Sequence, residues 1–377
     1  MRIGIDTFGC DHRRSGSGSY LFSLIANLPE TEHTEIELFG LEIDRFVYDS
    51  SKGTFAFAGI NIPDSLFALR LWHQFFLKSF IKKRNYDVVL YPAAMTVFPL
   101  TNIKPGVIVI NELFSSILKN ERGFFALKRL KKCLKNAEKI IVPSHCIKKE
   151  LIAFGVNAEK IEVIYNGVDH SIFKPKSVQN EDLVLIKPFA IKRPFFIYPS
   201  RIQHPEKKHV ELIKAFTLFK QRTALPHKLV IAGDEGQNAI IVQRAVLNSP
   251  YASDIVMTGY FPHQNLPDLY ACSDACLMPS VAEGFGMPII EAMACGIPVV
   301  CAKAGALSEI GGKGAIYIDP NNIEEFAASL EEVVKKSEEK NEIIEENKNW
   351  VSRFTWKNTV ERTTEVLKNS VRKEEYI

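Results

Sequence analysis

The sequence is poor in the residues that build disulfide frameworks and structural metal sites. It holds seven cysteines in 377 residues, an odd number, scattered mostly through apolar runs and with no pair in the C-x-x-C spacing. This distribution argues against a disulfide-stabilised secreted domain and against a structural zinc site. We therefore expect reduced cysteines in the core of a cytoplasmic protein, and no metal site.

Long apolar runs and an excess of one charge are also missing. No uninterrupted apolar run approaches the roughly 20 residues that a membrane-spanning helix needs, and the chain enters an apolar strand directly after Met1 and Arg2, without a signal-peptide pattern. The 47 Lys and Arg residues nearly balance the 44 Asp and Glu residues, which argues against nucleic acid as a partner. We expect a cytoplasmic protein, soluble or held peripherally at the inner face of a membrane.

Three motifs of nucleotide-binding enzymes are absent as well. The sequence has no D-x-D pair, which many transferases use to hold Mg²⁺ or Mn²⁺ at a departing diphosphate. It has no G-x4-G-K-[ST] loop, which excludes a P-loop kinase. The G-x-G pairs at 16–18 and 284–286 lack the third glycine of a dinucleotide fingerprint, since Leu21 and Ile289 stand there. These half-fingerprints favour a mononucleotide-type ligand.

The most informative stretch of the chain lies between residues 275 and 302. An apolar strand, Ala275 to Met278, leads into a glycine-containing loop, and Pro288 begins a short helix that ends at Cys295 before the strand Val299 to Ala302. In a strand–loop–helix–strand unit this loop lies at the carboxyl end of the strand, where open α/β sheets bind ligands. The loop amides and the positive helix end therefore predict an anion site.

Two carboxylates, Glu283 and Glu291, accompany this predicted anion site. They are eight positions apart, so the first lies in the loop and the second is expected on the first turn of the helix. A carboxylate repels phosphate, so each is best interpreted as an acceptor for ligand hydroxyl groups, which suits a ligand that carries phosphate and sugar. The alternatives are that Glu291 complements the helix dipole and that Glu283 is a solvated loop residue.

The run E-G-F-G-M-P-I-I-E-A-M-A-C-G-I-P-V-V, which begins at Glu283, resembles the E-x7-E signature of glycosyltransferase family 4, the retaining group 1 glycosyltransferases. The resemblance implies the GT-B fold, with two Rossmann-like α/β domains whose parallel sheets face each other across a cleft. It also implies nucleotide-sugar binding, with Glu291 on the nucleotide ribose and Glu283 near the donor sugar. The backbone of Phe285 and Gly286 would lie near the sugar and phosphate.

The N-terminal region reads as a strand, R-I-G-I-D, a loop that contains Gly16 and Gly18, and a helix from Ser19. A lone G-x-G is equally typical of a surface turn. The family carries a similar G-x-G-x-Y loop that reaches the donor phosphates, so the resemblance implies that Gly16 and Gly18 bind substrate. Further along, Asn111 stands in N-E-L where many relatives have His-Asp-Leu.

A second loop with positive charge follows the strand Phe195 to Tyr198. Arg201 and Lys207 lie there, at the same sheet edge as the Glu283 loop, so both can converge on one pair of phosphates. An Arg and a Lys in this loop bind the donor diphosphate in the family, and these two residues match them, with Lys208 as a competing candidate. Arg201, Lys207 and Glu283 are thus the catalytic candidates.

The resemblance covers nearly the whole chain and sets the domains. We expect an N-terminal acceptor-side domain over 1–173, a linker over 174–192, a nucleotide-sugar-binding domain over 193–355, and a C-terminal helix over 356–377 that packs back on the first domain. The basic amphipathic helix expected over 124–138 is compatible with an anionic membrane surface and equally with a solvated face.

The function expected from these observations is a retaining, metal-independent glycosyltransferase without a cofactor. It would move a hexose, with mannose suggested by analogy, from a GDP- or UDP-linked donor to a glycan or lipid-linked acceptor in surface polysaccharide synthesis. Two alternatives stay open, a nucleotide-sugar epimerase and a non-catalytic nucleotide-sugar binder. Dependence on an acceptor separates the transferase from the epimerase.

Overall fold

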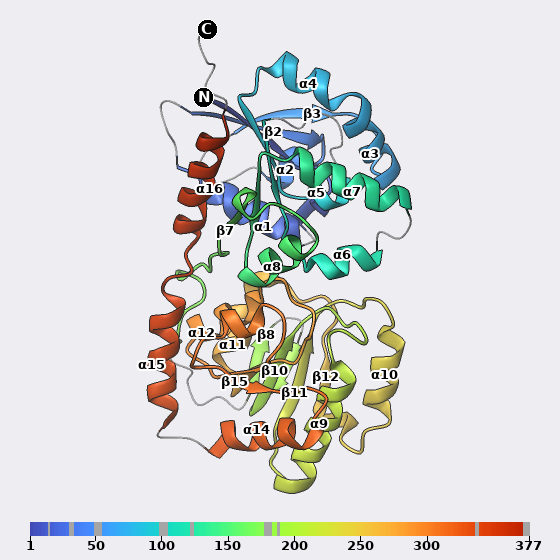
Figure 1. Ribbon diagram of the computed structural model, residues 1–377. Coiled ribbons are helices and arrows are strands. Elements are labelled where there is room, and N and C mark those ends of the chain that lie inside the picture. The colour runs from blue at the N-terminus through green and yellow to red at the C-terminus, as the bar shows by residue number, and fades with distance from the viewer. Residues whose placement is uncertain are drawn as a thin grey trace. The chain divides into compact units, whose positions relative to one another are not determined.

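The computed structural model shows two compact units, each built on a parallel β-sheet (Figure 1). Unit 1 consists of Met1–Gly167 and Trp356–Ile377, and unit 2 of Val168–Thr355. The division follows Gly167, whereas the sequence led us to expect a boundary after residue 173. The structure describes residues 1–13, 16–29, 34–48, 55–97, 105–120, 124–176, 183–186, 189–335 and 339–371.

Unit 1 has a seven-stranded sheet in the order β3-β2-β1-β4-β5-β6-β7, with every neighbouring pair parallel. Its strands are β1 (Arg2–Asp6), β2 (Glu35–Leu41), β3 (Ala56–Ile60), β4 (Val88–Tyr91), β5 (Gly106–Val109), β6 (Lys139–Val142) and β7 (Ile161–Val163). The central strands β4 and β5, V-V-L-Y and G-V-I-V, are buried throughout, as expected for strands covered on both faces by crossover helices.

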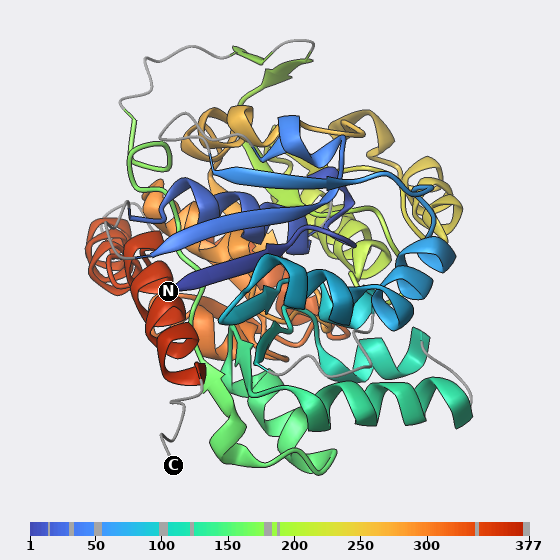
Figure 2. The ribbon, with the colours of Figure 1, turned by 90° about the horizontal axis from the view of Figure 1, so that it is seen from above.

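The helices of unit 1 cover both faces of its sheet. They are α1 (Gly16–Ala26), α2 (Asp44–Val47), α3 (Leu66–Phe75), α4 (Leu77–Arg84), α5 (Ala94–Val97), α6 (Phe114–Asn120), α7 (Phe124–Asn136), α8 (His145–Ala153) and α16 (Trp356–Ser370), with short 3₁₀ turns at Asp11–Arg13 and Ala158–Lys160. The C-terminal helix α16, red and next to the N-terminus in Figures 1 and 2, packs on α1 and on strands β4 to β6. Trp356, Val360 and Leu367 of α16 join the core of this unit.

Unit 2 has a six-stranded parallel sheet in the order β12-β11-β10-β13-β14-β15. Its strands are β10 (Phe195–Pro199), β11 (Lys228–Ala232), β12 (Ile255–Met257), β13 (Ala275–Met278), β14 (Val299–Ala302) and β15 (Ile316–Ile318). Its helices are α9 (His209–Thr223), α10 (Ala239–Leu247), α11 (Leu266–Ala271), α12 (Met287–Ala294), α13 (Leu307–Ile310), α14 (Ile323–Lys335) and α15 (Glu339–Val351), with 3₁₀ turns at Ala252–Asp254 and His263–Asn265. A separate antiparallel hairpin, β8 (Leu183–Ile186) with β9 (Phe189–Lys192), lies within the segment expected as a linker.

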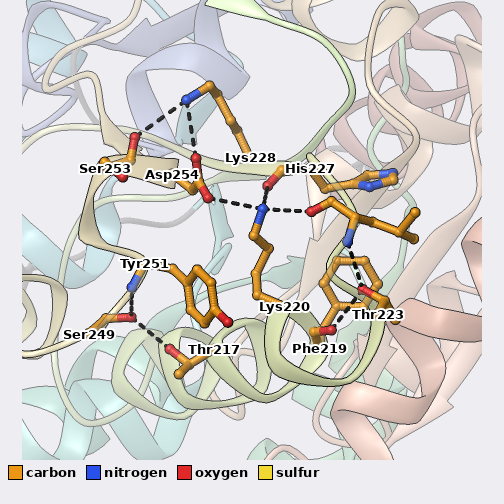
Figure 3. A network of polar contacts seen from close by, with 11 residues as sticks. Thr217, Phe219, Lys220, Thr223, His227, Lys228, Ser249, Tyr251, Ser253 and Asp254 are labelled. Carbon is orange, nitrogen blue, oxygen red and sulfur yellow. Dashed lines mark hydrogen bonds and ion pairs between the residues drawn. The ribbon is translucent and has the colours of Figure 1, made fainter.

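A buried lysine ties the end of α9 to the amino-terminal edge of the second sheet (Figure 3). The Lys220 ammonium donates to the carbonyl oxygens of Leu225 and His227, at 2.6 and 3.2 Å, and pairs with the Asp254 carboxylate at 2.9 Å. An ammonium group has three donors, so these contacts satisfy Lys220 completely. The network closes the turn between α9 and β11.

One helix boundary differs from the expectations. Helix α1 begins at Gly16, three residues before the predicted start. The segment that follows Ser65 forms two helices, α3 and α4, that meet at Phe76. Across the described part of the chain, no helix combines the length and apolar character that crossing a bilayer requires.

Candidate functional site

The candidate site of unit 2 lies where β10 and β13 end. These strands are parallel neighbours, with Phe196 opposite Ala275, so the loops that follow them leave the same edge of the sheet. The amide of Val281 donates to the carbonyl of Glu206 at 3.0 Å and joins the two loops. The sheet topology thus brings together the two segments that the sequence singled out.

Lys207 and Glu283 meet at this junction. The Lys207 Nζ lies 2.5 Å from Glu283 Oε1, and the two side chains are 21% and 16% exposed. The hydroxyl group of Tyr198, at the end of β10, donates to the Lys207 carbonyl at 2.8 Å and holds the loop on the sheet. The ammonium therefore lies in contact with one of the two predicted carboxylates.

Arg201 lies on the same loop, and its side chain is exposed. Its backbone runs against the turn Gly233–Gly236 after β11, because the Ile202 amide donates to Asp234 and the Gly236 amide donates to Ile202, both at 2.8 Å. A Cβ on Gly236 would come within 2.9 Å of the Arg201 side chain. Gly233 and Gly236 let the turn approach the arginine closely. The sequence did not predict this contact, although glycines in the turn that follows a strand are a signal for a close approach.

Lys208, the competing candidate, is directed elsewhere. Its Nζ contacts Glu211 Oε1 at 3.1 Å and Asn321 Oδ1 at 2.8 Å. The residue has φ of 55° and immediately precedes α9. The two neighbouring lysines therefore have different partners. Among the interactions of the described residues, Lys207 contacts Glu283 and Lys208 does not.

The glycine loop before α12 is formed by backbone geometry that other residues rarely adopt. Gly286 has φ of 99° and precedes the first turn of α12, and a Cβ there would lie 2.6 Å from Leu307 Cδ2. The Phe285 side chain is buried and contacts Phe354 edge-on, with ring centroids 6.0 Å apart. Because its ring is packed, Phe285 can offer a ligand only its backbone.

Glu291 is buried, with 3% of its surface exposed. Its carboxylate accepts a hydrogen bond from the Tyr270 hydroxyl at 2.8 Å and contacts His263 Nε2 at 3.0 Å. Burial, reinforced by this carboxylate, raises the pKa of Tyr270 well above its ordinary value. As the fifth residue of α12, Glu291 lies on the second turn, so its predicted place on the first turn is wrong. Its partners come from segments between β12 and β13 that the sequence did not connect to it.

In unit 1 the two candidate glycines differ from each other. A Cβ on Gly18 would lie 2.1 Å from the Cys10 carbonyl oxygen, whereas nothing lies within 4 Å of a Cβ on Gly16. Both are in the first turn of α1 and not in the loop before it. The close approach of the Cys10–Arg13 backbone therefore requires a glycine at position 18.

Unit 1 also contains a pocket of about 210 Å³ at the carboxyl ends of β4 and β5. Its lining includes Arg70 of α3, Thr96, and Asn111 at the end of β5. Arg70 Nε donates to the Thr96 carbonyl at 2.9 Å. Both polar atoms of the Asn111 side chain are buried, and within the described ranges neither has a hydrogen-bond partner. The pocket thus presents an amide donor and acceptor that a hydroxylated ligand could satisfy.

No group of three or more His, Cys, Asp or Glu side chains that could hold a metal ion occurs in the part of the chain that the structure describes.

Comparisons with known families match both halves of the chain. Residues 184–350 match the profile described as Glycosyl transferases group 1, and residues 14–172 match Glycosyltransferase Family 4. One relative is an O-antigen chain mannosyltransferase B of Escherichia coli, 28% identical over 66% of this chain and 65% of its own length. Another is an O-antigen chain mannosyltransferase of Salmonella typhimurium, 26% identical over 61% of this chain and 59% of its own. The matches thus span less than two thirds of these relatives.

Solved structures show the same fold. An Anabaena protein, HepE, in complex with UDP and glucose, is similar with a TM-score of 0.76 and 19% identity, over 98% of this chain and 100% of that chain. Sucrose-phosphate synthase from Thermosynechococcus elongatus is similar with a TM-score of 0.76 and 15% identity, over 98% of both chains. At such identities the likeness shows the fold, GT-B, as expected.

Proposed function

Since the chain belongs to the group 1, family 4 glycosyltransferases, we propose that it moves a hexose from a nucleotide-diphosphate sugar to a glycan or lipid-linked acceptor, with retention at the anomeric carbon. The O-antigen mannosyltransferases among its relatives favour mannose, from GDP-mannose, and a role in surface polysaccharide synthesis. The observation that carries the proposal is the contact of Lys207 with Glu283 at the sheet edge that also bears Arg201 and the start of α12.

The charges of this edge suit a departing diphosphate. Lys207 gives one of its three donors to Glu283, so two donors remain for phosphate oxygens. The Arg201 guanidinium can bind a phosphate with two parallel hydrogen bonds, and the N-terminus of α12 adds its positive dipole end. Fixed positive groups of this kind stabilise the negative charge that develops on a leaving group.

In the reaction that we propose, the bond between the anomeric carbon and the diphosphate oxygen breaks. The acceptor hydroxyl oxygen forms its new bond on the same face, and its proton passes to the departing phosphate oxygen. Arg201, Lys207 and the α12 terminus take the electrostatic role, and no divalent ion is needed. Glu283, fixed by Lys207, would accept a hydrogen bond from a hydroxyl of the donor sugar.

The remaining candidates have binding roles in this proposal. Glu291, held by Tyr270 and His263, would accept hydrogen bonds from the ribose hydroxyls, and the Phe285–Gly286 backbone would lie along the sugar and phosphate. Gly16 and Gly18 would bind substrate through the first-turn backbone of α1. We assign the acceptor to the pocket of unit 1, because the amide of Asn111 can pair with a neutral sugar hydroxyl.

Transfer assays on charge variants test the proposal. With a donor found by a thermal-shift panel of GDP- and UDP-sugars, Arg201→Ala and Lys207→Gln should each lower kcat by about 100-fold to 1,000-fold, the range seen when one stabilising donor is removed. Lys208→Gln is the matched control, since its side chain points to Glu211 and Asn321, and it should keep most of the activity. Equal rates for the Lys207 and Lys208 variants would remove the proposed mechanism.

Two further assays separate the alternatives. Turnover should be unchanged by EDTA, and a loss restored by Mg²⁺ or Mn²⁺ would contradict metal independence. Conversion of donor without an acceptor to an isomeric nucleotide sugar would indicate an epimerase. Donor binding by calorimetry, without transfer or hydrolysis across an acceptor panel, would indicate a non-catalytic binder.

A further inference from the structure

Helix α3 carries a row of exposed apolar side chains on its outer face. Phe67, Leu71 and Phe75 are 74%, 38% and 64% exposed, and their spacing of four residues places them in one line along the helix. Phe76, between α3 and α4, is 61% exposed and extends the row. Single exposed apolar residues are ordinary, whereas a contiguous row of large ones marks an interaction surface.

The row is held in place by a well-anchored helix. The opposite face of α3 buries Leu69, Trp72 and His73. His73 Nε2 lies 2.7 Å from Asp6 Oδ2 at the end of β1, and its Nδ1 donates to the Leu69 carbonyl at 2.7 Å. The helix therefore cannot rotate to bury the exposed row without breaking a buried polar contact.

The charged side chains on the helices that carry and flank the row are all basic, although the exposed Asp64 precedes α3. Helices α3, α4 and α7 contain no Asp or Glu, although the whole chain has a net charge of only +3. Their exposed basic residues are Lys78, Lys82 and Lys83 on α4, and Lys128, Arg129, Lys131, Lys132 and Lys135 on α7. These helices therefore carry a local excess of positive charge that the rest of the chain offsets.

The topology places these helices on one face of the sheet. The connections from β3 to β4, which holds α3 and α4, and from β5 to β6, which holds α7, run in the same direction along the strand order. Right-handed crossovers put both on the same face. The connection from β1 to β2 runs the other way and puts α1 on the opposite face, where α16 contacts it. Figure 1 shows α3, α4 and α7 at the outside of unit 1.

We propose that the apolar row of α3 and the basic faces of α4 and α7 form a docking surface for an anionic lipid bilayer. Aromatic and leucine side chains enter the interface between head groups and acyl chains, and lysines bind the anionic head groups. A second copy of the chain fits this surface poorly, because a two-fold interface would bring like charges together. From the sequence, the helix over residues 124–138 was the candidate for contact with a membrane. In the structure α7 supplies basic side chains, and Leu127 is its exposed large apolar residue among the described side chains.

Residues of α3 that lie beside the row line the pocket of unit 1. Leu66 and Arg70 line that pocket, one residue and three residues from Phe67. A lipid-linked acceptor held in the docked bilayer would thus present its glycan near Asn111. This consequence rests on the proposed transfer function, whereas the docking itself does not.

Vesicle flotation tests the docking surface with the full chain. The protein should bind vesicles that mix phosphatidylglycerol with phosphatidylcholine, bind phosphatidylcholine alone weakly, and lose binding at high salt. The triple variant K78Q/K82Q/K83Q should bind the anionic vesicles about 100-fold less tightly, from the loss of three charges near the surface. The double variant F67S/F75S should lose about 30-fold, from the loss of inserted apolar area.

Controls separate loss of docking from loss of folding or activity. Leu247 on α10 is 77% exposed, so Leu247→Ser is the matched control and should bind as the parent protein does. Circular dichroism should show all variants folded, and transfer to a soluble acceptor should be unchanged in F67S/F75S. Equal vesicle binding by F67S/F75S and the parent protein would overturn the proposal. So would a concentration-dependent dimer, seen by ultracentrifugation, that only F67S/F75S lacks.

Discussion

Two of the lysine–carboxylate pairs of unit 2, Lys220–Asp254 and Lys207–Glu283, lie at opposite edges of its sheet, and they differ in how fully each ammonium is bonded. Lys220, 7% exposed, uses its three donors on two carbonyls and Asp254. Lys207, 21% exposed, contacts Glu283, and no other acceptor for its ammonium occurs in the described residues. The saturated pair stabilises the fold, whereas the unsaturated pair retains donors for a ligand. The number of unused donors on each ammonium therefore distinguishes a structural ion pair from one that can bind a ligand.

Replacing each of the two lysines by methionine tests this difference most directly. Lys220→Met should lower the free energy of unfolding by about 3 kcal/mol, because it leaves the carbonyl oxygens of Leu225 and His227 without their donor. It also leaves the Asp254 carboxylate with Lys228 as its remaining lysine partner in the described residues. Lys207→Met should lower it by less than about 1 kcal/mol, because its pair is partly solvated. Urea unfolding followed by circular dichroism measures both. Comparable losses in the two variants would contradict the distinction.

A glycine substitution extends the comparison to unit 1. Gly18→Ala should destabilise the protein by about 3 kcal/mol, because the added Cβ overlaps the Cys10 carbonyl and the backbone must move. Gly16→Ala, in open space at the start of the same helix, should change stability by less than about 0.5 kcal/mol. Thermal unfolding of the pair of variants measures the difference. If both variants unfold alike, the tight contact at position 18 is wrong.

A histidine beside the unsaturated lysine makes the site sensitive to acid. Burial, with a smaller contribution from the Lys207 charge, lowers the pKa of His209 to about 4, although its bond to the Gln203 carbonyl acts in the opposite direction. Since the unfolded state takes up the proton first, stability is lost as the pH falls from about 6.5 toward 4, by about 2 kcal/mol at pH 5. Urea unfolding at about pH 7 and pH 5 should show this loss, and it should be nearly absent in His209→Phe.

The smallest expected effect tests the binding role proposed for Glu291. Tyr270→Phe removes one hydrogen bond to this carboxylate and should lower the free energy of unfolding by about 1 kcal/mol. Because the carboxylate is then less fixed, donor affinity should fall while kcat changes little. Calorimetric titration of the nucleotide sugar, with steady-state rates beside it, measures both. A fall in kcat alone would place Glu291 in the chemical step instead.

The sequence predicted the skeleton of unit 2 well, because its strands are short, apolar and bounded by glycine or proline. The strands Ala275–Met278 and Val299–Ala302 have the predicted bounds. Because β10 and β13 are parallel neighbours, the loops that follow them lie at one edge of the sheet. The contact of Lys207 with Glu283 follows from this topology. Helix ends were harder, since Gly16 and Phe76 gave no capping signal that marks the true boundary.

What the sequence could not supply were contacts between segments that are distant in the chain. Tyr270 and His263 reach Glu291 through the packing of α11 and its preceding turn on α12, and no local pattern records that packing. The exposure of Phe67 and Phe75 was likewise invisible, because an apolar face toward solvent and one toward a core have the same periodicity. The direction of a helix face is settled only by its neighbours.

The return of the C-terminal helix has a consequence for synthesis of the chain. Unit 2 is one continuous stretch, Val168–Thr355, whereas unit 1 is completed only by residues from Trp356 onward. Trp356, Val360 and Leu367 fill the core that the first residues begin. On the ribosome, the later-made half can therefore fold first, and the earlier-made half must wait, with part of its apolar interior uncovered, until the last helix leaves the exit tunnel.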